Sequence, residues 1–177
     1  ADSTALTLGE VLVSGAAGGP LEARRVLSSV DILPTARIES QVVSNNWELF
    51  GQVPGVMLTQ FGQGVTSGKF SMRGFNGEGE INAVKLLIDG VPSNSNDGNM
   101  PYIDLAPRLD IESIEVVRGT NDPRYGLHNI AGNANIATRS GGNYLLGRAT
   151  VGSFNTLGLQ AAAGIEKDGL SQNYAVG

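Results

Sequence analysis

Residues 111–139 read Ile-Glu-Ser-Ile-Glu-Val-Val-Arg-Gly, Thr-Asn-Asp-Pro-Arg-Tyr-Gly, Leu-His-Asn-Ile and Ala-Gly-Asn-Ala-Asn-Ile-Ala-Thr-Arg, and the rest of the chain is arranged around them. The β-branched run at 114–117 predicts a short strand, and residues 135–138 predict a second one. The residues between these strands are rich in turn formers, including glycines and the pair Asp122-Pro123. The segment therefore predicts two strands that frame one polar loop.

Charged side chains gather in this frame, namely Glu112, Glu115, Arg118, Arg124 and Arg139. Charges at the ends of strands are usually solvated, and the pattern alone favours that interpretation. A specific role for any of them needs information beyond the pattern.

Composition excludes several classes of function. The chain has 177 residues, about the length of one domain with a real core. Its 12 Lys+Arg against 17 Asp+Glu give a formal charge of -5, and no basic run is present. The sequence therefore has no cluster of positive charge of the kind that binds the phosphates of a nucleic acid. With no cysteine and one histidine, disulfides, thiolate zinc sites, cysteine nucleophiles and histidine metal clusters are excluded by count. Apolar runs are only a few residues long, far below the roughly 20 that a membrane-spanning helix needs.

No motif of an enzyme or metal site stands out. His128 has no partner pattern around it and is interpreted as an ordinary loop histidine. Residues 94–99 supply oxygen side chains, but they hold one carboxylate and their glycine is misplaced for a calcium loop. Asp110 and Glu112 have no specific hydrolase spacing. The sequence therefore favours a protein that is not an enzyme.

The other segments predict short strands and short helices. Asn45 and Glu48 have the spacing of a capping box, which predicts a short helix that ends at Pro54-Gly55. Residues 105–113 are compatible with a second short helix, and Asp89-Gly90 is a strong hairpin signal. The further predicted strands are residues 25–33, 56–59, 70–73 and 84–88.

The central segment resembles the I-E-x-I-E-V-x-R-G, Y-G, G-x-x-N-I-x-T-R/K signature of the plug domain of TonB-dependent outer-membrane receptors. Met72-Arg73-Gly74-Phe75 and Leu87-Ile88-Asp89-Gly90-Val91-Pro92 resemble two further blocks of that family, in the same order. Asn133 and Ala134 depart from the signature, where a second glycine and a bulkier aliphatic residue are usual. Within the family, Val117-Arg118-Gly119 followed by Arg124-Tyr125-Gly126 looks most like receptors for ferric chelates such as ferric citrate.

The resemblance implies an α+β plug domain with a mixed sheet and short helices, followed by the first antiparallel strands of an incomplete transmembrane β-barrel. The implied boundaries are 1–19 for a TonB-box segment and flexible tether, 20–142 for the plug, and 143–177 for the barrel strands. Residues 144–153, 157–166 and 170–177 are the predicted barrel strands, low in charge and each about 10 residues long. The 35 residues after Gly142 (177 minus 142) hold about three such strands, whereas plugged transporters have about 22.

The resemblance also implies a function without catalysis. The chain would be the plug of an active transporter in the outer membrane, inside the barrel lumen with its N-terminus in the periplasm. It would bind and import a scarce nutrient, with a ferric chelate as cargo rather than cofactor. The implied partners are a TonB-type periplasmic coupling protein, the remainder of the barrel, a small-molecule nutrient and the outer membrane.

Three sets of site residues follow from the resemblance. The TonB box, a strand-competent segment before a glycine-rich tether, comprises Glu10, Val11, Leu12, Val13, Ser14 and Gly15. Ligand contacts are expected from loop residues Gln60, Phe61, Gln63, Asn76 and Asn96. Ionic contacts between plug and barrel are expected from Arg73, Arg118, Glu112 and Glu115.

A second interpretation stays open on the residues alone. Loops rich in glycine and asparagine also suit a soluble periplasmic or secreted binding module that recognises a carbohydrate or a peptide. Several hundred further residues of alternating strands would separate the receptor from this module.

Overall fold

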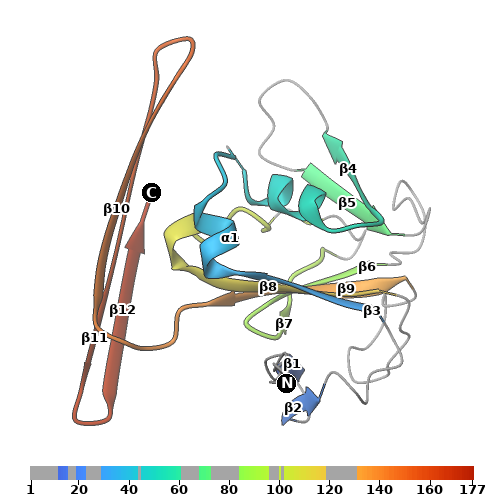
Figure 1. Cartoon of the computed structure of the whole chain (residues 1–177), viewed down its shortest axis with the longest axis horizontal. Coiled ribbons are helices and arrows are strands. Elements are labelled where there is room, and N and C mark those ends of the chain that lie inside the picture. Colours follow the sequence, from blue (N-terminus) through green and yellow to red (C-terminus); the bar gives the residue numbers. More distant parts are fainter. Residues whose placement is uncertain are drawn as a thin grey trace, which may run out of the picture.

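The computed structural model of this chain describes residues 12–15, 19–22, 29–43, 45–60, 68–72, 84–95, 100, 102–118 and 131–177. Its centre is a five-stranded sheet with the strand order β3-β8-β9-β6-β7 (Figure 1). Strands β6 and β9 run parallel and the other neighbours antiparallel, so the sheet is mixed, as predicted. The bounds of these strands are β3 (Ser29–Pro34), β6 (Val84–Ile88), β7 (Val91–Pro92), β8 (Ile111–Arg118) and β9 (Gly132–Thr138).

Strands β8 and β9 are the two that were predicted to frame the polar loop, and they pair antiparallel along their length. Side chains alternate along β8, so Ile114 and Val116 enter the hydrophobic core while Glu115 lies on the opposite face. Gly132 begins β9 with φ +144, and a Cβ there would lie 2.1 Å from the carbonyl oxygen of Val117. Only glycine tolerates this close approach of the two backbones.

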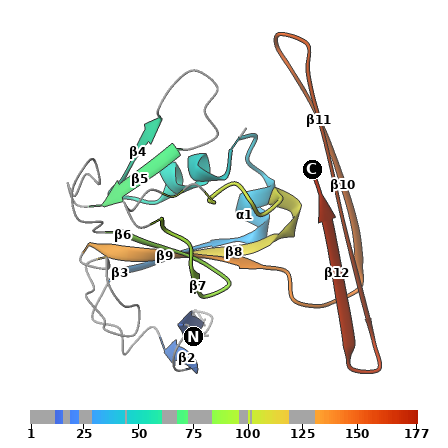
Figure 2. The same ribbon diagram turned by 180° about the vertical axis from the view of Figure 1, so that it is seen from behind.

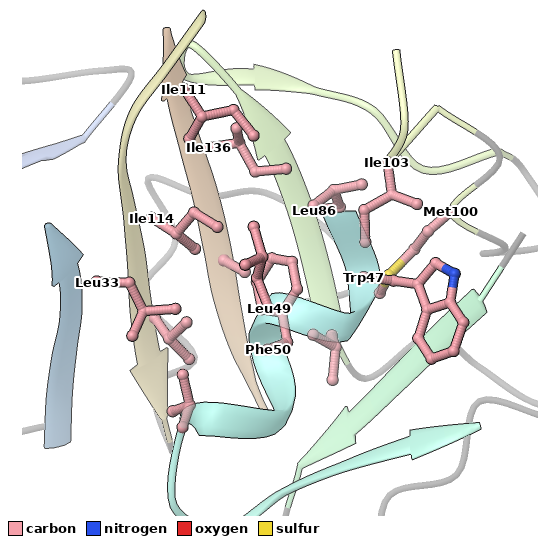
Figure 3. Close-up of a cluster of buried hydrophobic side chains, with 14 of the residues drawn as sticks. Leu33, Trp47, Leu49, Phe50, Leu86, Met100, Ile103, Ile111, Ile114 and Ile136 are labelled. Carbon is pink, nitrogen blue, oxygen red and sulfur yellow. The ribbon is translucent and has the colours of Figure 1, made fainter. Parts of the chain in front are cut away.

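Helices and a hairpin cover one face of the sheet and enclose the core (Figures 1 and 2). They are α1 (Thr35–Glu39), the 3₁₀ helix η2 (Asn46–Gln52) and the hairpin of β4 (Val56–Gln60) with β5 (Gly68–Met72). Leu49 and Phe50 of η2 are 0% exposed and lie against Ile114 and Ile136 of the sheet (Figure 3). Burial of these side chains is the main stabilising contribution of this layer.

The helix at residues 45–53 forms as predicted, because the backbone N–H of Asn45 donates to the Glu48 carboxylate at 3.0 Å. The helix predicted at 105–113 is shorter, since η3 (Arg108–Asp110) ends where β8 begins at Ile111. Helix α1 was not predicted; it begins directly after Pro34 and buries Ile38. The strand predicted at 25–33 is described only from Ser29 onward, as β3.

The Asp89-Gly90 turn forms the predicted hairpin between β6 and β7. Both residues have positive φ, 50 and 77, as turns that match the twist of a hairpin require. The Asp89 carboxylate accepts hydrogen bonds from the backbone N–H of Thr138 at 2.7 Å and from its hydroxyl at 2.8 Å. The turn is therefore fixed to the end of β9.

A separate three-stranded antiparallel sheet stands beside this domain (Figure 1). Its strands β10 (Tyr144–Gly152), β11 (Thr156–Lys167) and β12 (Leu170–Val176) lie where the three barrel strands were predicted. The register places Leu145 beside Ala163 and Val151 beside Leu157, so large apolar side chains share one face. That face is exposed and carries Leu145, Val151, Leu157, Leu159, Ile165, Leu170, Tyr174 and Val176.

A short antiparallel hairpin joins β1 (Leu12–Gly15) to β2 (Gly19–Glu22). It lies on the opposite side of the five-stranded sheet from the β4–β5 hairpin, in both views (Figures 1 and 2). Within the described residues, no helix is both long enough and apolar enough to cross a membrane.

Candidate functional site

The predicted ligand loops fall mostly outside the described residues, which is the case for Phe61, Gln63, Asn76 and Asn96. Gln60 is the last residue of β4, where its backbone pairs with Gly68 of β5. The β4–β5 hairpin thus holds both ends of residues 61–67 together. These ligand contacts remain predictions.

Four of the six residues of the predicted coupling segment form β1, namely Leu12, Val13, Ser14 and Gly15. Glu10 and Val11 lie outside the described residues. The residues after it were expected to form a glycine-rich tether, but Gly19–Glu22 form β2, which pairs antiparallel with β1, with Leu12 opposite Glu22 and Gly15 opposite Gly19. The segment is therefore able to pair as a strand, and its role in coupling remains a prediction.

The residues predicted to make ionic contacts with the barrel are not gathered in one place. The Arg118 guanidinium binds the Asp31 carboxylate and the carbonyl oxygen of Pro54, on the core side of the sheet. Glu115 is buried on the other face, Glu112 is exposed, and Arg73 lies outside the described residues. Arg118 therefore ties β3 to the turn after η2, and the expected contacts with a barrel wall remain predictions.

The face of the five-stranded sheet opposite the core carries a buried polar row that the sequence analysis missed. It consists of Lys85, Glu115, Asn133 and Asn135, all at most 9% exposed. The pairing places Lys85 beside Asn133 and Asn135 beside Glu115. The alternation of Asn133 and Asn135 with small or apolar residues along β9 was the available signal. Buried polar groups of this kind are usually hydrogen-bonded.

Three arginines converge on residues 39–43, which begin at the last residue of α1. Arg139 Nη2 lies 2.8 Å from the Glu39 carboxylate, and Arg148 of β10 donates to the carbonyl oxygens of Glu39 and Gln41. Arg108 of η3 donates to the carbonyl oxygen of Val43. We call Arg108, Arg139 and Arg148 the arginine clamp, and residues 39–43 the α1 tail.

The clamp is tied in turn to η3 and to the three-stranded sheet. Arg139 Nε donates to the carbonyl oxygen of Leu109 at 2.9 Å, and its guanidinium lies 5.2 Å from the centre of the Tyr144 ring of β10. Helix η3 lies against β10, β11 and β12. Sequence reasoning named Arg139 only as a charge in the central segment and missed Arg148, which is the one charged residue of β10.

A buried asparagine joins η2 to residues 103–106. The Asn46 side-chain amide donates to the carbonyl oxygens of Ile103 at 3.2 Å and Ala106 at 2.7 Å, and its backbone N–H donates to the Asp104 carboxylate. Burial raises the pKa of Asp104 above the ordinary value of an aspartate, although the Asn46 N–H opposes this rise. The other Asp104 carboxylate oxygen is buried without a partner.

We expect Asp104→Asn to change the pH dependence of stability. The folded-state pKa of Asp104 is raised, so its protonated form favours the folded state; this contribution is complete below the unfolded pKa and is lost as pH rises through the folded pKa. The asparagine variant stays neutral and does not show that loss. Urea unfolding at a series of pH values from acid to neutral should therefore give a free-energy difference, variant minus wild type, that increases with pH. Parallel profiles for the two proteins would contradict the assignment.

Among the residues that the structure describes, no group of three or more His, Cys, Asp or Glu side chains gathers as metal ligands. The arrangement instead offers two structural units, a sheet domain and an apolar-faced three-stranded sheet, held together by arginines. Such an arrangement suits the positioning of one unit against the other.

Comparisons with known proteins cover most of the chain. The family model described as the TonB-dependent receptor plug domain matches residues 22–133. The chain is 31% identical over 115 residues to the vitamin B12 transporter BtuB of Vibrio vulnificus strain CMCP6, covering 65% of this chain and 18% of that protein. It is 31% identical over 137 residues to the iron-regulated outer membrane virulence protein of Vibrio cholerae serotype O1, covering 73% and 20%. The chain thus spans about a fifth of the length of these relatives.

Solved structures share the fold. The ferric yersiniabactin uptake receptor FyuA of Yersinia pestis superposes with a TM-score of 0.64 at 22% identity, covering 80% of this chain and 22% of that one. The alcaligin outer membrane receptor FauA of Bordetella pertussis gives 0.65 at 24% identity, covering 93% and 29%. At these identities the likeness concerns the fold alone.

Proposed function

Because this chain belongs to the TonB-dependent receptor plug domain family, we propose that it is the plug, with the first barrel strands, of an outer-membrane transporter that imports a ferric chelate. Family membership confirms the resemblance, the α+β plug fold and the outer-membrane location that were expected from the sequence. The relatives are transporters and receptors rather than enzymes, as was also expected.

One observation carries the proposal, namely the three-stranded sheet beside the plug. One of its faces exposes large apolar side chains at a period of two residues, as a strand that meets lipid does. Polar side chains such as Arg148 point instead toward the plug. A soluble binding module would have to leave this apolar face in water, which makes that second interpretation the weaker one.

The arrangement of the hairpins supports a direction of transport. The β1–β2 hairpin, which includes the predicted coupling segment, and the β4–β5 hairpin, which ends at the predicted ligand loop, lie on opposite sides of the five-stranded sheet (Figure 2). A periplasmic coupling protein at one side and an external nutrient at the other would suit this arrangement.

We propose a ferric chelate as the transported ligand, with cobalamin as the alternative. The iron-regulated relative favours a ferric chelate, as do Val117-Arg118-Gly119 and Arg124-Tyr125-Gly126. The relative that is named a vitamin B12 transporter makes cobalamin the second candidate.

Uptake by whole cells tests the proposal. The full receptor that contains this chain is expressed in cells lacking their own receptors for ferric citrate, ferric siderophores and cobalamin, and radiolabelled forms of each are supplied. We expect a ferric chelate to accumulate, and a protonophore to abolish its accumulation. Uptake of cobalamin alone would overturn the ferric-chelate assignment. A receptor that takes up none of them but binds a carbohydrate or peptide would favour the binding module.

A further inference from the structure

We propose that the turn between β10 and β11 is a contact with lipid, in which Phe154 lies at the boundary between the headgroups and the acyl chains of the outer leaflet. The inference rests on the proposed function, which places the three-stranded sheet in the outer membrane. It adds that the first hairpin of the barrel ends at this boundary. The turn is then not one of the external loops that reach the nutrient.

Phe154 has no packing role within the chain. Its side chain is 100% exposed, in the turn of residues 153–155. The backbone N–H of Thr156 donates to the carbonyl oxygen of Ser153 at 3.3 Å, and both Phe154 and Asn155 have positive φ, 59 and 60. Turns of this kind favour Asn and Gly, because a bulky side chain in the left-handed region is strained. A contact outside the chain gives this ring a role that the fold does not.

The turn at the other end of β11 has the opposite character. It consists of Asp168-Gly169, with φ 51 and 79, a pair that adopts positive φ readily. Glu166 and Lys167 precede it, so three consecutive charged residues lie at this end of the sheet. Residues 149–165, which include the Phe154 turn, hold no Asp, Glu, Lys or Arg. Because charges are costly in lipid, the charged turn suits water and the uncharged turn suits the membrane.

The apolar face of the sheet continues up to the Phe154 turn. Val151 of β10 and Leu157 of β11 pair next to it and are 82% and 67% exposed. From Ile165 to Thr156, β11 extends about 30 Å at roughly 3.3 Å per residue. A strand tilted by about 40° covers about 23 Å of height over this length, close to the roughly 25 Å of the apolar band of an outer-membrane barrel. The turn therefore lies at the border of this band, where a ring can leave water for the acyl chains.

The turn lies on the side of the molecule that holds the predicted ligand loop. In both views, the turn between β10 and β11 is on the same side of the five-stranded sheet as the β4–β5 hairpin, and the turn between β11 and β12 is on the side of the β1–β2 hairpin (Figures 1 and 2). Outer-membrane barrels have short periplasmic turns and longer external loops. The connection at 153–155 is as short as a periplasmic turn. This hairpin therefore ends in the outer leaflet instead of above it, and contributes no loop to the nutrient site.

Depth-dependent quenching of tryptophan fluorescence tests the inference. Phe154→Trp is introduced into the full receptor that contains this chain, and the receptor is reconstituted in phosphatidylcholine vesicles. The emission of the new tryptophan is the difference from wild type. The quenchers are lipids brominated near the headgroup, lipids brominated near the chain end, and iodide in water on both sides of the bilayer. We expect the bromines near the headgroup to quench most strongly, several-fold more than iodide.

Two matched variants calibrate the measurement. Leu159→Trp places the ring in the middle of the exposed apolar face and should be quenched most by the bromines near the chain end. Asp168→Trp places it in the charged turn, at a residue that also has positive φ, and should be quenched by iodide alone. If Phe154→Trp does not fold, Ser153→Trp in the same turn replaces it, with the same expected result.

Each contrary outcome has a distinct meaning. Iodide quenching of Phe154→Trp equal to that of Asp168→Trp would show that the turn lies in water and would overturn the inference. A change in emission on addition of ferric citrate, without quenching by brominated lipid, would overturn it and assign the turn to the nutrient site. Insensitivity to all three quenchers would overturn it in favour of a protein chain over the turn. If Leu159→Trp too were quenched by iodide and not by bromine, the proposed function itself would fail.

Discussion

We expect Leu12→Pro to abolish energised uptake by the full receptor while leaving nutrient binding intact. Leu12 begins β1, which is able to pair as a strand because its backbone already pairs with β2. Addition of a strand to a partner's sheet uses backbone N–H and C=O groups rather than particular side chains. Proline removes one N–H group and fixes φ, so it should prevent that pairing. Uptake of a labelled ferric chelate by cells, and its binding to the purified receptor, measure the two effects separately.

The matched control for this change is Val13→Ile in the same strand. It preserves the β-branched side chain and all backbone donors, so uptake should remain close to wild type. Normal uptake by Leu12→Pro would refute the coupling role of the segment. Loss of both uptake and binding would instead assign Leu12–Gly15 to the structural framework of the plug.

Replacing Phe50 should cause the largest loss of stability among single core changes. Phe50 is 0% exposed and lies among Leu49, Ile114 and other buried side chains beneath η2 (Figure 3). Removal of its ring leaves a cavity, and Phe50→Ala should reduce the free energy of unfolding by about 3–5 kcal/mol. Urea unfolding followed by tryptophan fluorescence measures the loss, because Trp47 lies in the same helix and the same core cluster.

Phe154→Ala is the control, since this phenylalanine is 100% exposed in the turn between β10 and β11. Its removal should change the free energy of unfolding by less than about 0.5 kcal/mol. Equal losses for the two variants would show that the ring of Phe50 does not support the core in solution.

Local patterns determined those elements whose partners lie close in the chain. The β-branched run at 114–117 lies within β8, the Asn45-Glu48 spacing produced η2, and Asp89-Gly90 formed its turn. The low-charge segments after residue 142 formed β10, β11 and β12, which are joined by short turns. Such elements follow from backbone propensity and side-chain spacing, which act over a few residues.

Contacts between distant residues depended on the tertiary structure. Arg118 could be recognised as a charge at the end of a strand, but its partner Asp31 is 87 positions away. Arg148 and the Glu39 carbonyl oxygen are 109 positions apart, and nothing in the local sequence of either residue indicates the other. Helix α1 forms beside β8, where Thr35 binds the carbonyl oxygen of Glu112, so its five residues depend on the sheet rather than on their own propensity. Strand order and the direction of long charged side chains are set when separate elements pack, and no periodicity within one element encodes them.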